Sequence, residues 1–189
     1  QAAVDGMIRV RLDSMGTVST TGTMSVSGYY VAESSSGGVT FSKGDTLSVT
    51  ASGSQLTLTG GGQSYSMGSS FTLSQRQDAN GNTGLITLSN TRFGTRSYQG
   101  DFTFYASGNT LTIVNTVYLE TYLYGVVGNE MDNAWPLEAL KAQAVAARTY
   151  AYMDMTGSGT YDIGDTTNDQ VYKGYRASDD VVMRAVNET

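Results

Sequence analysis

One glutamate, Glu130, has the position in the sequence that a proton donor requires. It follows an apolar segment and is followed directly by Met131. Apolar surroundings favour the neutral form of a carboxyl group, so such a side chain retains a proton to donate near neutral pH. The same position also suits an ordinary loop carboxylate, or one that caps the following helix.

Two cations, Lys141 and Arg148, are seven residues apart in an alanine-rich run. In a helix this spacing places both side chains on nearly the same face. They could hold acidic or polar groups of a ligand, since arginine offers paired donors and lysine a point charge. Alternatively they form a solvated face, or pair with acids of the same chain such as Glu138 or Asp165.

A third polar group occupies residues 165–174 and ends with an aromatic residue and a glycine. Short side chains with donors and acceptors suit a carbohydrate groove, and they suit equally a capped loop before a strand. The acids Asp162, Asp165 and Asp169 do not follow the spacing of an EF-hand calcium loop. We therefore predict no metal site from this group.

The composition excludes several kinds of chemistry. The chain of 189 residues has no Cys and no His, which removes thiol nucleophiles, histidine bases and the usual zinc ligands. Its net charge of −6 disfavours nucleic acid as a partner. The sequence begins at Gln1, is rich in Ser, Thr, Gly and Tyr, and has no run long enough to span a bilayer. We expect a secreted or cell-envelope protein whose leader has been removed.

Two parts of the chain differ in composition, and their secondary structure must position these residues. Up to about residue 106, short alternating stretches such as residues 23–31, 46–50 and 85–88 predict half-buried strands in a small sandwich or barrel-like module. Residues 51–58 and 106–113 resemble each other, and each predicts a hairpin with a glycine-containing turn.

Helical patterns follow these strands. Apolar residues from 119 to 127 predict a helix of about two turns that stops near Gly128. Pro136 suits the first turn of a second helix, which runs from residue 137 to about 154. Because alanines occupy all its sides, we expect this helix at the centre of a domain, with Tyr150, Tyr152, Met153 and Met155 filling the space around its far end.

Three blocks of residues in this region resemble the SpoIID family, which includes stage II sporulation protein D and proteins named amidase enhancers. They are residues 119–131 (LETYLYGVVGNEM), 136–151 (PLEALKAQAVAARTYA) and 165–174 (DTTNDQVYKG). The three blocks occur in the family's order, and the middle one is nearly uninterrupted. Residues before about 90 carry no strong family motif.

The resemblance implies a peptidoglycan lytic transglycosylase that cleaves between N-acetylmuramic acid and N-acetylglucosamine. Its product is a 1,6-anhydro sugar, formed without water and without a cofactor. The implied catalytic residue is Glu130. The implied substrate-binding residues are Lys141, Arg148, Asp165, Thr166, Thr167 and Gln170.

The chain departs from the family pattern in two ways. Some relatives carry Cys or His in the third block, where this chain has Asn168 and Asp169, so a zinc site of that kind cannot form. The family's domain normally continues further, so we expect a chain truncated at its C-terminus. The name amidase enhancer supports a second hypothesis, a non-catalytic peptidoglycan-binding protein that stimulates a cell-wall amidase. Retention of Glu130 favours the enzyme.

These patterns together predict an α+β fold. A β-rich N-terminal module over residues 1–90 precedes a helix-containing SpoIID-type domain over residues 91–189. The expected partners are peptidoglycan glycan strands and, under the second hypothesis, a cell-wall amidase. No nucleic acid is expected.

Overall fold

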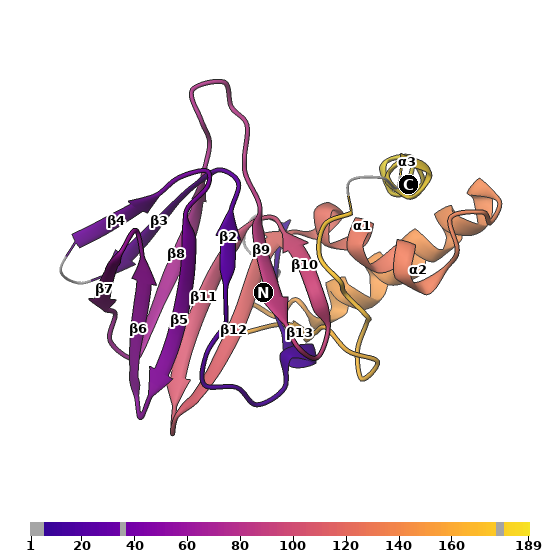
Figure 1. Cartoon of the computed structure of the whole chain (residues 1–189). Coiled ribbons are helices and arrows are strands. Elements are labelled where there is room, and N and C mark those ends of the chain that lie inside the picture. The colour runs from indigo at the N-terminus through magenta and orange to yellow at the C-terminus, as the bar shows by residue number, and fades with distance from the viewer. Residues whose placement is uncertain (1–5, 35–36, 177–179) are drawn as a thin grey trace. The chain divides into compact units, whose positions relative to one another are not determined.

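The computed structural model describes residues 6–34, 37–176 and 180–189, and within them the fold is α+β, with two sheets and three α-helices (Figure 1). The helices are α1 (Leu119–Glu130), α2 (Leu137–Asp154) and α3 (Asp180–Asn187), with a 3-10 turn at Asp13–Met15. The strands are β1 (Met7–Arg11), β2 (Met24–Val26), β3 (Tyr29–Ser34), β4 (Gly37–Phe41), β5 (Thr46–Ser52), β6 (Gln55–Gly60), β7 (Gln63–Ser66), β8 (Ser70–Arg76), β9 (Ile86–Asn90), β10 (Gly94–Tyr98), β11 (Asp101–Ser107), β12 (Thr110–Tyr118) and β13 (Ile163–Gly164).

The chain folds into two compact units. The helical unit consists of Gln1–Asp13 and Thr116–Thr189, and the sheet unit consists of Ser14–Asn115. This division differs from the predicted one in residues 1–13, which join the helical unit, and in residues 91–115, which join the sheet unit. The reason is pairing, because β9 pairs with β2 and β11 pairs with β8, which keeps the strands up to residue 115 with the earlier ones.

The sheet unit is built from antiparallel strands in two sheets. One has the order β12-β11-β8-β3-β4 and the other the order β10-β9-β2-β5-β6-β7. Side chains alternate between buried and exposed along β5, β6 and β11, so each sheet has one apolar face. Since β11 contacts both β5 and β6, the apolar faces meet, in agreement with the predicted sandwich.

The two similar stretches at residues 51–58 and 106–113 form the predicted hairpins, β5-β6 and β11-β12. Their turns also contact each other. The backbone N–H of Asn109 donates to the carbonyl of Gly53 at 3.1 Å, and the Asn109 side-chain oxygen accepts from the N–H of Gly53. Both residues have positive φ, which glycine and asparagine tolerate best.

The predicted strand over residues 23–31 is two strands, β2 and β3, in different sheets. The break lies at Gly28, which meets Gly84 so closely that an added Cβ would be 2.5 Å from the Gly84 Cα. Only two glycines allow two backbones to approach in this way. Sequence alternation alone does not reveal such a contact.

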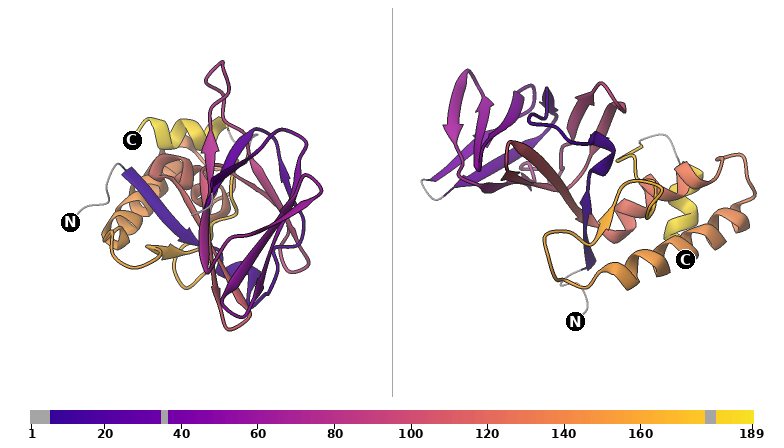
Figure 2. Two further views of the ribbon diagram at one scale, coloured as in Figure 1. Left: turned by 90° about the vertical axis from the view of Figure 1, so that its left-hand side faces the viewer. Right: turned by 90° about the horizontal axis from the view of Figure 1, so that it is seen from below.

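The helical unit contains a short parallel pair of strands. Val10 and Arg11 of β1 lie opposite Ile163 and Gly164 of β13. The three helices contact one another, as Figure 2 shows, and in the described residues none is long and apolar enough to cross a membrane. Its buried apolar residues include Ile8, Val10, Tyr122, Leu123, Val126, Val127, Leu140, Ala144, Ala147, Ala151, Tyr172, Val182, Ala185 and Val186.

Helix α2 has the predicted bounds but not the predicted central place. Its buried residues are spaced four, three and four apart, at 140, 144, 147 and 151, so one face packs and the opposite face is exposed. The space-filling role expected of Tyr150, Tyr152, Met153 and Met155 was also wrong for the first three. Met155 is buried, whereas Met153 is 76% exposed and Tyr152 59% exposed.

Candidate active site

Glu130 is the last residue of α1. The helix is held by an apolar face of Tyr122, Leu123, Val126 and Val127, and the N–H of Met131 donates to the Val127 carbonyl at 3.1 Å. The helix was predicted to stop near Gly128 but runs through it. A glycine in a helix costs only about 1 kcal/mol, which the packing of this face outweighs.

Two side chains fix the end of α1 on which Glu130 lies. The Arg176 guanidinium donates from Nη1 to the Gly128 carbonyl at 2.9 Å, and the Asn129 amide donates to the Gly125 carbonyl. Carbonyls in the last turn of a helix have no partner within the helix, and cations are favourable there. The backbone that carries Glu130 is therefore held by Arg176 from outside the helix and by Asn129 from within it.

The side chain of Glu130 is exposed, so the apolar surroundings predicted from the sequence were wrong. Four of the five glutamates in the sequence form ion pairs: Glu33 with Arg76, Glu120 with Arg148, Glu138 with Lys141, and Glu188 with Lys141 and Arg184. Glu130 is the exception, since its carboxylate has no hydrogen bond or ion pair with any residue that the structure describes. It is the glutamate that remains available to a ligand.

The loop after α1 presents an aromatic ring to solvent. The Asp132 carboxylate accepts from the N–H of Ala134 at 2.9 Å, and the Asp132 carbonyl accepts from the N–H of Trp135 at 3.0 Å. This turn leaves the indole of Trp135 54% exposed. Sequence reasoning assigned Trp135 no role, although its being the only tryptophan was a signal that could have drawn attention to it.

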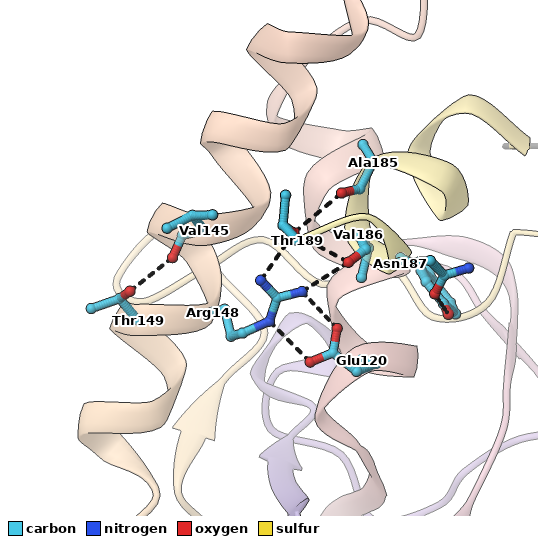
Figure 3. A network of polar contacts seen from close by, with 9 residues as sticks. Glu120, Val145, Arg148, Thr149, Ala185, Val186, Asn187 and Thr189 are labelled. Atoms are coloured by element: carbon cyan, nitrogen blue, oxygen red, sulfur yellow. Dashed lines mark hydrogen bonds and ion pairs between the residues drawn. The ribbon is translucent and has the colours of Figure 1, made fainter.

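Arg148 joins all three helices of the unit (Figure 3). Its Nε and Nη2 donate to the two carboxylate oxygens of Glu120 at 2.9 and 2.7 Å, a bidentate pair between α2 and α1. Its Nη2 also donates to the Val186 carbonyl of α3 at 3.0 Å. The carboxylate of Glu120 holds the pKa of Arg148 above its usual value. These contacts give Arg148 a structural role, whether or not it also binds substrate.

Lys141 forms ion pairs with Glu138 at 2.9 Å and with Glu188 at 2.7 Å. The first of these is the internal pairing that the sequence left open for this residue. Hydrogen bonds to Glu188 and Glu138 raise the pKa of the Lys141 ammonium. Ligand binding by Lys141 and Arg148 stays a prediction, and it would compete with these carboxylates.

The Glu188 pairs predict a dependence of stability on pH. Hydrogen bonds from Arg184 and Lys141 lower the pKa of Glu188 from 4.5 to about 2. A carboxyl pKa that is lower in the folded state stabilises fully above the unfolded value, and the effect is lost as pH falls through the folded value. We expect Glu188→Gln to lower the melting temperature of the helical unit at neutral pH. The difference from wild type should disappear as pH falls from about 4.5 toward 2.

Far-UV circular dichroism measures this prediction, because α1, α2 and α3 all belong to the helical unit. Glu138→Gln is the matched control, since Lys141 then keeps its pair with Glu188. A difference between wild type and Glu188→Gln that persists unchanged at the lowest pH would contradict the role of this ion pair.

The polar residues of the third block are not equivalent. Asp165 is buried at 2% exposure, and its backbone binds the Arg11 carbonyl and the N–H of Tyr172. Thr166 is half-buried and Thr167 is exposed. Of the predicted substrate-binding residues in this block, Thr167 is therefore the most accessible, and Asp165 is part of the core of the loop.

Gln170 connects two helices. Its side-chain oxygen accepts from the Tyr122 hydroxyl of α1 at 3.2 Å, and its Nε2 lies 3.4 Å from the Ala147 carbonyl of α2. Tyr122 also packs against Tyr172 with ring centroids 4.9 Å apart, and burial raises the pKa of the Tyr122 hydroxyl. The structure thus places Gln170 in the packing between loop and helices, and its binding of substrate stays a prediction.

Gly125 allows the third block to reach α1. A Cβ at this position would lie 2.5 Å from the Gly174 carbonyl and 2.7 Å from the Tyr172 ring. The absence of a side chain at Gly125 therefore permits close packing between the third block and α1. Within the described residues, no group of three or more Asp or Glu side chains is arranged to hold a metal ion.

Comparison with known proteins matches the C-terminal part of the chain to a family. Residues 107–189 match the family model SpoIID, Stage II sporulation protein. This match includes α1, α2, the third block and every predicted site residue. No solved structure matches the chain.

Three curated relatives match parts of the chain. An uncharacterized protein of Brachyspira hyodysenteriae (strain ATCC 49526 / WA1) is 41% identical over 95 residues, 49% of this chain and 26% of the relative. The Amidase enhancer of Bacillus subtilis (strain 168) is 58% identical over 53 residues, 28% of this chain and 7% of the relative. Stage II sporulation protein D of the same organism is 41% identical over 66 residues, 32% of this chain and 19% of the relative. The matches thus cover only a minor part of each relative.

Proposed function

Because residues 107–189 carry a SpoIID domain, we propose that the protein is a peptidoglycan lytic transglycosylase with Glu130 as its proton donor. The observation that carries the proposal is the state of this carboxylate. It is exposed at a helix end held by Arg176, and it is the glutamate without an ion-pair partner among the described residues. A glutamate needed only for stability would be expected to pair, as the other four do.

The proposed reaction needs one carboxyl group. Protonated Glu130 donates its proton to the glycosidic oxygen between N-acetylmuramic acid and N-acetylglucosamine, and the bond from that oxygen to C1 breaks. The C6 hydroxyl of the muramic residue then attacks its own C1, and the Glu130 carboxylate accepts the hydroxyl proton. A C–O bond is exchanged for another, no water enters, and the product is a 1,6-anhydro sugar.

Exposure of Glu130 is compatible with this role if the glycan itself covers the carboxyl group. A sugar ring lying over Glu130 would displace water, and loss of hydration favours the neutral carboxyl that donates the proton. The exposed indole of Trp135 follows five residues later and offers a face on which such a ring can stack. The substrate places the protein outside the cytoplasm, in the cell envelope or secreted.

A second function is supported by the 58% identity to a protein named Amidase enhancer. In this alternative the protein binds peptidoglycan and stimulates a cell-wall amidase without cleaving glycan. The two functions make opposite predictions about Glu130, because a binding protein needs no proton donor.

Product analysis separates the two functions. The whole protein is incubated with intact and with peptide-free peptidoglycan, alone and with a cell-wall amidase, and the fragments are identified by mass spectrometry. The proposal expects 1,6-anhydro-muramic ends, lighter than hydrolysed ends by one water, from the protein alone. Faster release of stem peptides by the amidase, with no anhydro ends in any reaction, would contradict the proposal and support the alternative.

A further inference from the structure

An open groove of about 540 Å³ lies in the sheet unit, and no predicted catalytic or substrate-binding residue lines it. It is lined by Tyr29, Val31, Thr40 and residues 76–80. Its volume lies within the roughly 300 to 1,000 Å³ typical of small-molecule sites. None of these residues belongs to the segment that matches the family model.

The floor of the groove is the outer face of a sheet. Tyr29 and Val31 alternate along β3 with the fully buried Tyr30 and Ala32, so they point away from the core. Tyr29 lies opposite Arg76 of β8, and Val31 lies opposite Thr40 of β4. The Tyr29 side chain is 45% exposed, which leaves much of its ring free for a ligand.

The wall of the groove is a preorganised loop between β8 and β9, which stands out beyond the strands in Figure 1. The Asp78 carboxylate accepts from the N–H groups of Asn80 and Asn82, both at 2.8 Å, and the Asp78 carbonyl accepts from Gly81 at 3.0 Å. The hydrogen bonds to the carboxylate, chiefly that from the Asn82 backbone, lower the pKa of Asp78. A loop closed in this way offers its polar groups without a large ordering cost on binding.

The groove has no excess of positive charge. Arg76 and Asp78 are the charged residues that line it, and they have opposite signs. Arg76 also donates to Glu33 at 2.7 Å, so its charge is already compensated. This arrangement offers little to a phosphate or to another strongly acidic ligand.

A neutral, polyhydroxylated ligand matches these groups. The side-chain amides of Gln77 and Asn80 and the hydroxyl of Thr40 each both donate and accept hydrogen bonds, as sugar hydroxyls do. The Tyr29 ring provides a flat apolar surface for the C–H face of a pyranose, and Val31 and Ala79 provide contacts for a methyl group. We propose that this groove is a second glycan-binding site, which takes one or two N-acetylated amino sugars.

The side chains that line the groove are the evidence that its ligand is a glycan. The choice of N-acetylated sugars rests on the proposed function. Binding here would hold a glycan strand on the sheet unit independently of cleavage at Glu130. The two sites can therefore be tested separately, because they lie in different compact units.

The test is a titration of the whole chain, labelled with ¹⁵N, with N,N′,N″-triacetylchitotriose, followed by NMR. We expect shifts concentrated at residues 29–31, 40 and 76–80, and a Kd that rises at least about tenfold in Tyr29→Ala. Tyr29→Phe keeps the ring and should bind within about twofold of wild type. Tyr118→Ala is the matched control, because Tyr118 is 64% exposed and does not line the groove.

Several results would overturn the proposal. They are an absence of shifts in the groove, an unchanged Kd in Tyr29→Ala, or equal binding of a stem-type tetrapeptide at the same residues. Shifts confined to residues 118–176 would instead indicate binding near Glu130 and would also count against a second site. Failure here leaves the proposed function standing, because anhydro-product formation is measured separately and depends on Glu130.

Discussion

Replacing Glu130 by glutamine is expected to lower the rate of anhydro-muramic end formation about 10²- to 10⁴-fold, the usual contribution of a general acid. Glutamine has nearly the same shape but no proton to donate, so binding of peptidoglycan should change little. The loss should appear in the rate at saturating substrate, measured by mass spectrometry of peptide-free peptidoglycan digested by the whole protein.

The matched control for this substitution is Glu138→Gln. Glu138 is also an exposed glutamate beside a helix end, but its carboxylate pairs with Lys141, which keeps Glu188 as a second partner. We expect the control to digest peptidoglycan as wild type does. Equal rates for Glu130→Gln and wild type would refute the role of Glu130, whereas equal losses in both variants would indicate a general effect of charge.

Gly125→Val is expected to destabilise the helical unit by about 3 kcal/mol, near the upper end for overpacking a core. The first added carbon already meets the Gly174 carbonyl at 2.5 Å and the Tyr172 ring at 2.7 Å. Because one neighbour is backbone and the other ring is itself packed on Tyr122, neither can move aside cheaply. Unfolding by denaturant, followed by the helical far-UV dichroism, measures the loss.

Ala142→Val provides the control for this experiment. Ala142 is exposed on α2 in the same unit, so the new side chain meets solvent and costs only the lower helix propensity of valine, up to about 0.7 kcal/mol. A loss in Gly125→Val no larger than in the control would show that the third block does not pack against α1 as described. Peptidoglycan digestion should fall together with stability in Gly125→Val, because the same packing holds the end of α1.

The local elements of this protein could be predicted from its sequence. Helix α2 has the predicted bounds, because the helix propensity of alanine and the helix start favoured by Pro136 are both local effects. The hairpins β5-β6 and β11-β12 were found for the same reason, since a glycine-containing turn between alternating residues is a local signal. The resemblance to the SpoIID family could also be found from the sequence, because it depends on the order of residues along the chain.

Tertiary structure decided the surroundings of each candidate site residue. Residues distant in the sequence decide whether Glu130 is buried and which helices Gln170 connects. They also supply the ion pairs of Lys141 with Glu188 and of Arg148 with Glu120. The same holds for β1, which joins the helical unit by pairing with β13, more than a hundred residues later. Sequence periodicity shows that a face is apolar but not what covers it, and for α2 the structure leaves one side exposed. Composition and residue order thus determined the local elements of this protein and the family that its residues 107–189 resemble, whereas long-range packing determined which side chains a ligand can reach.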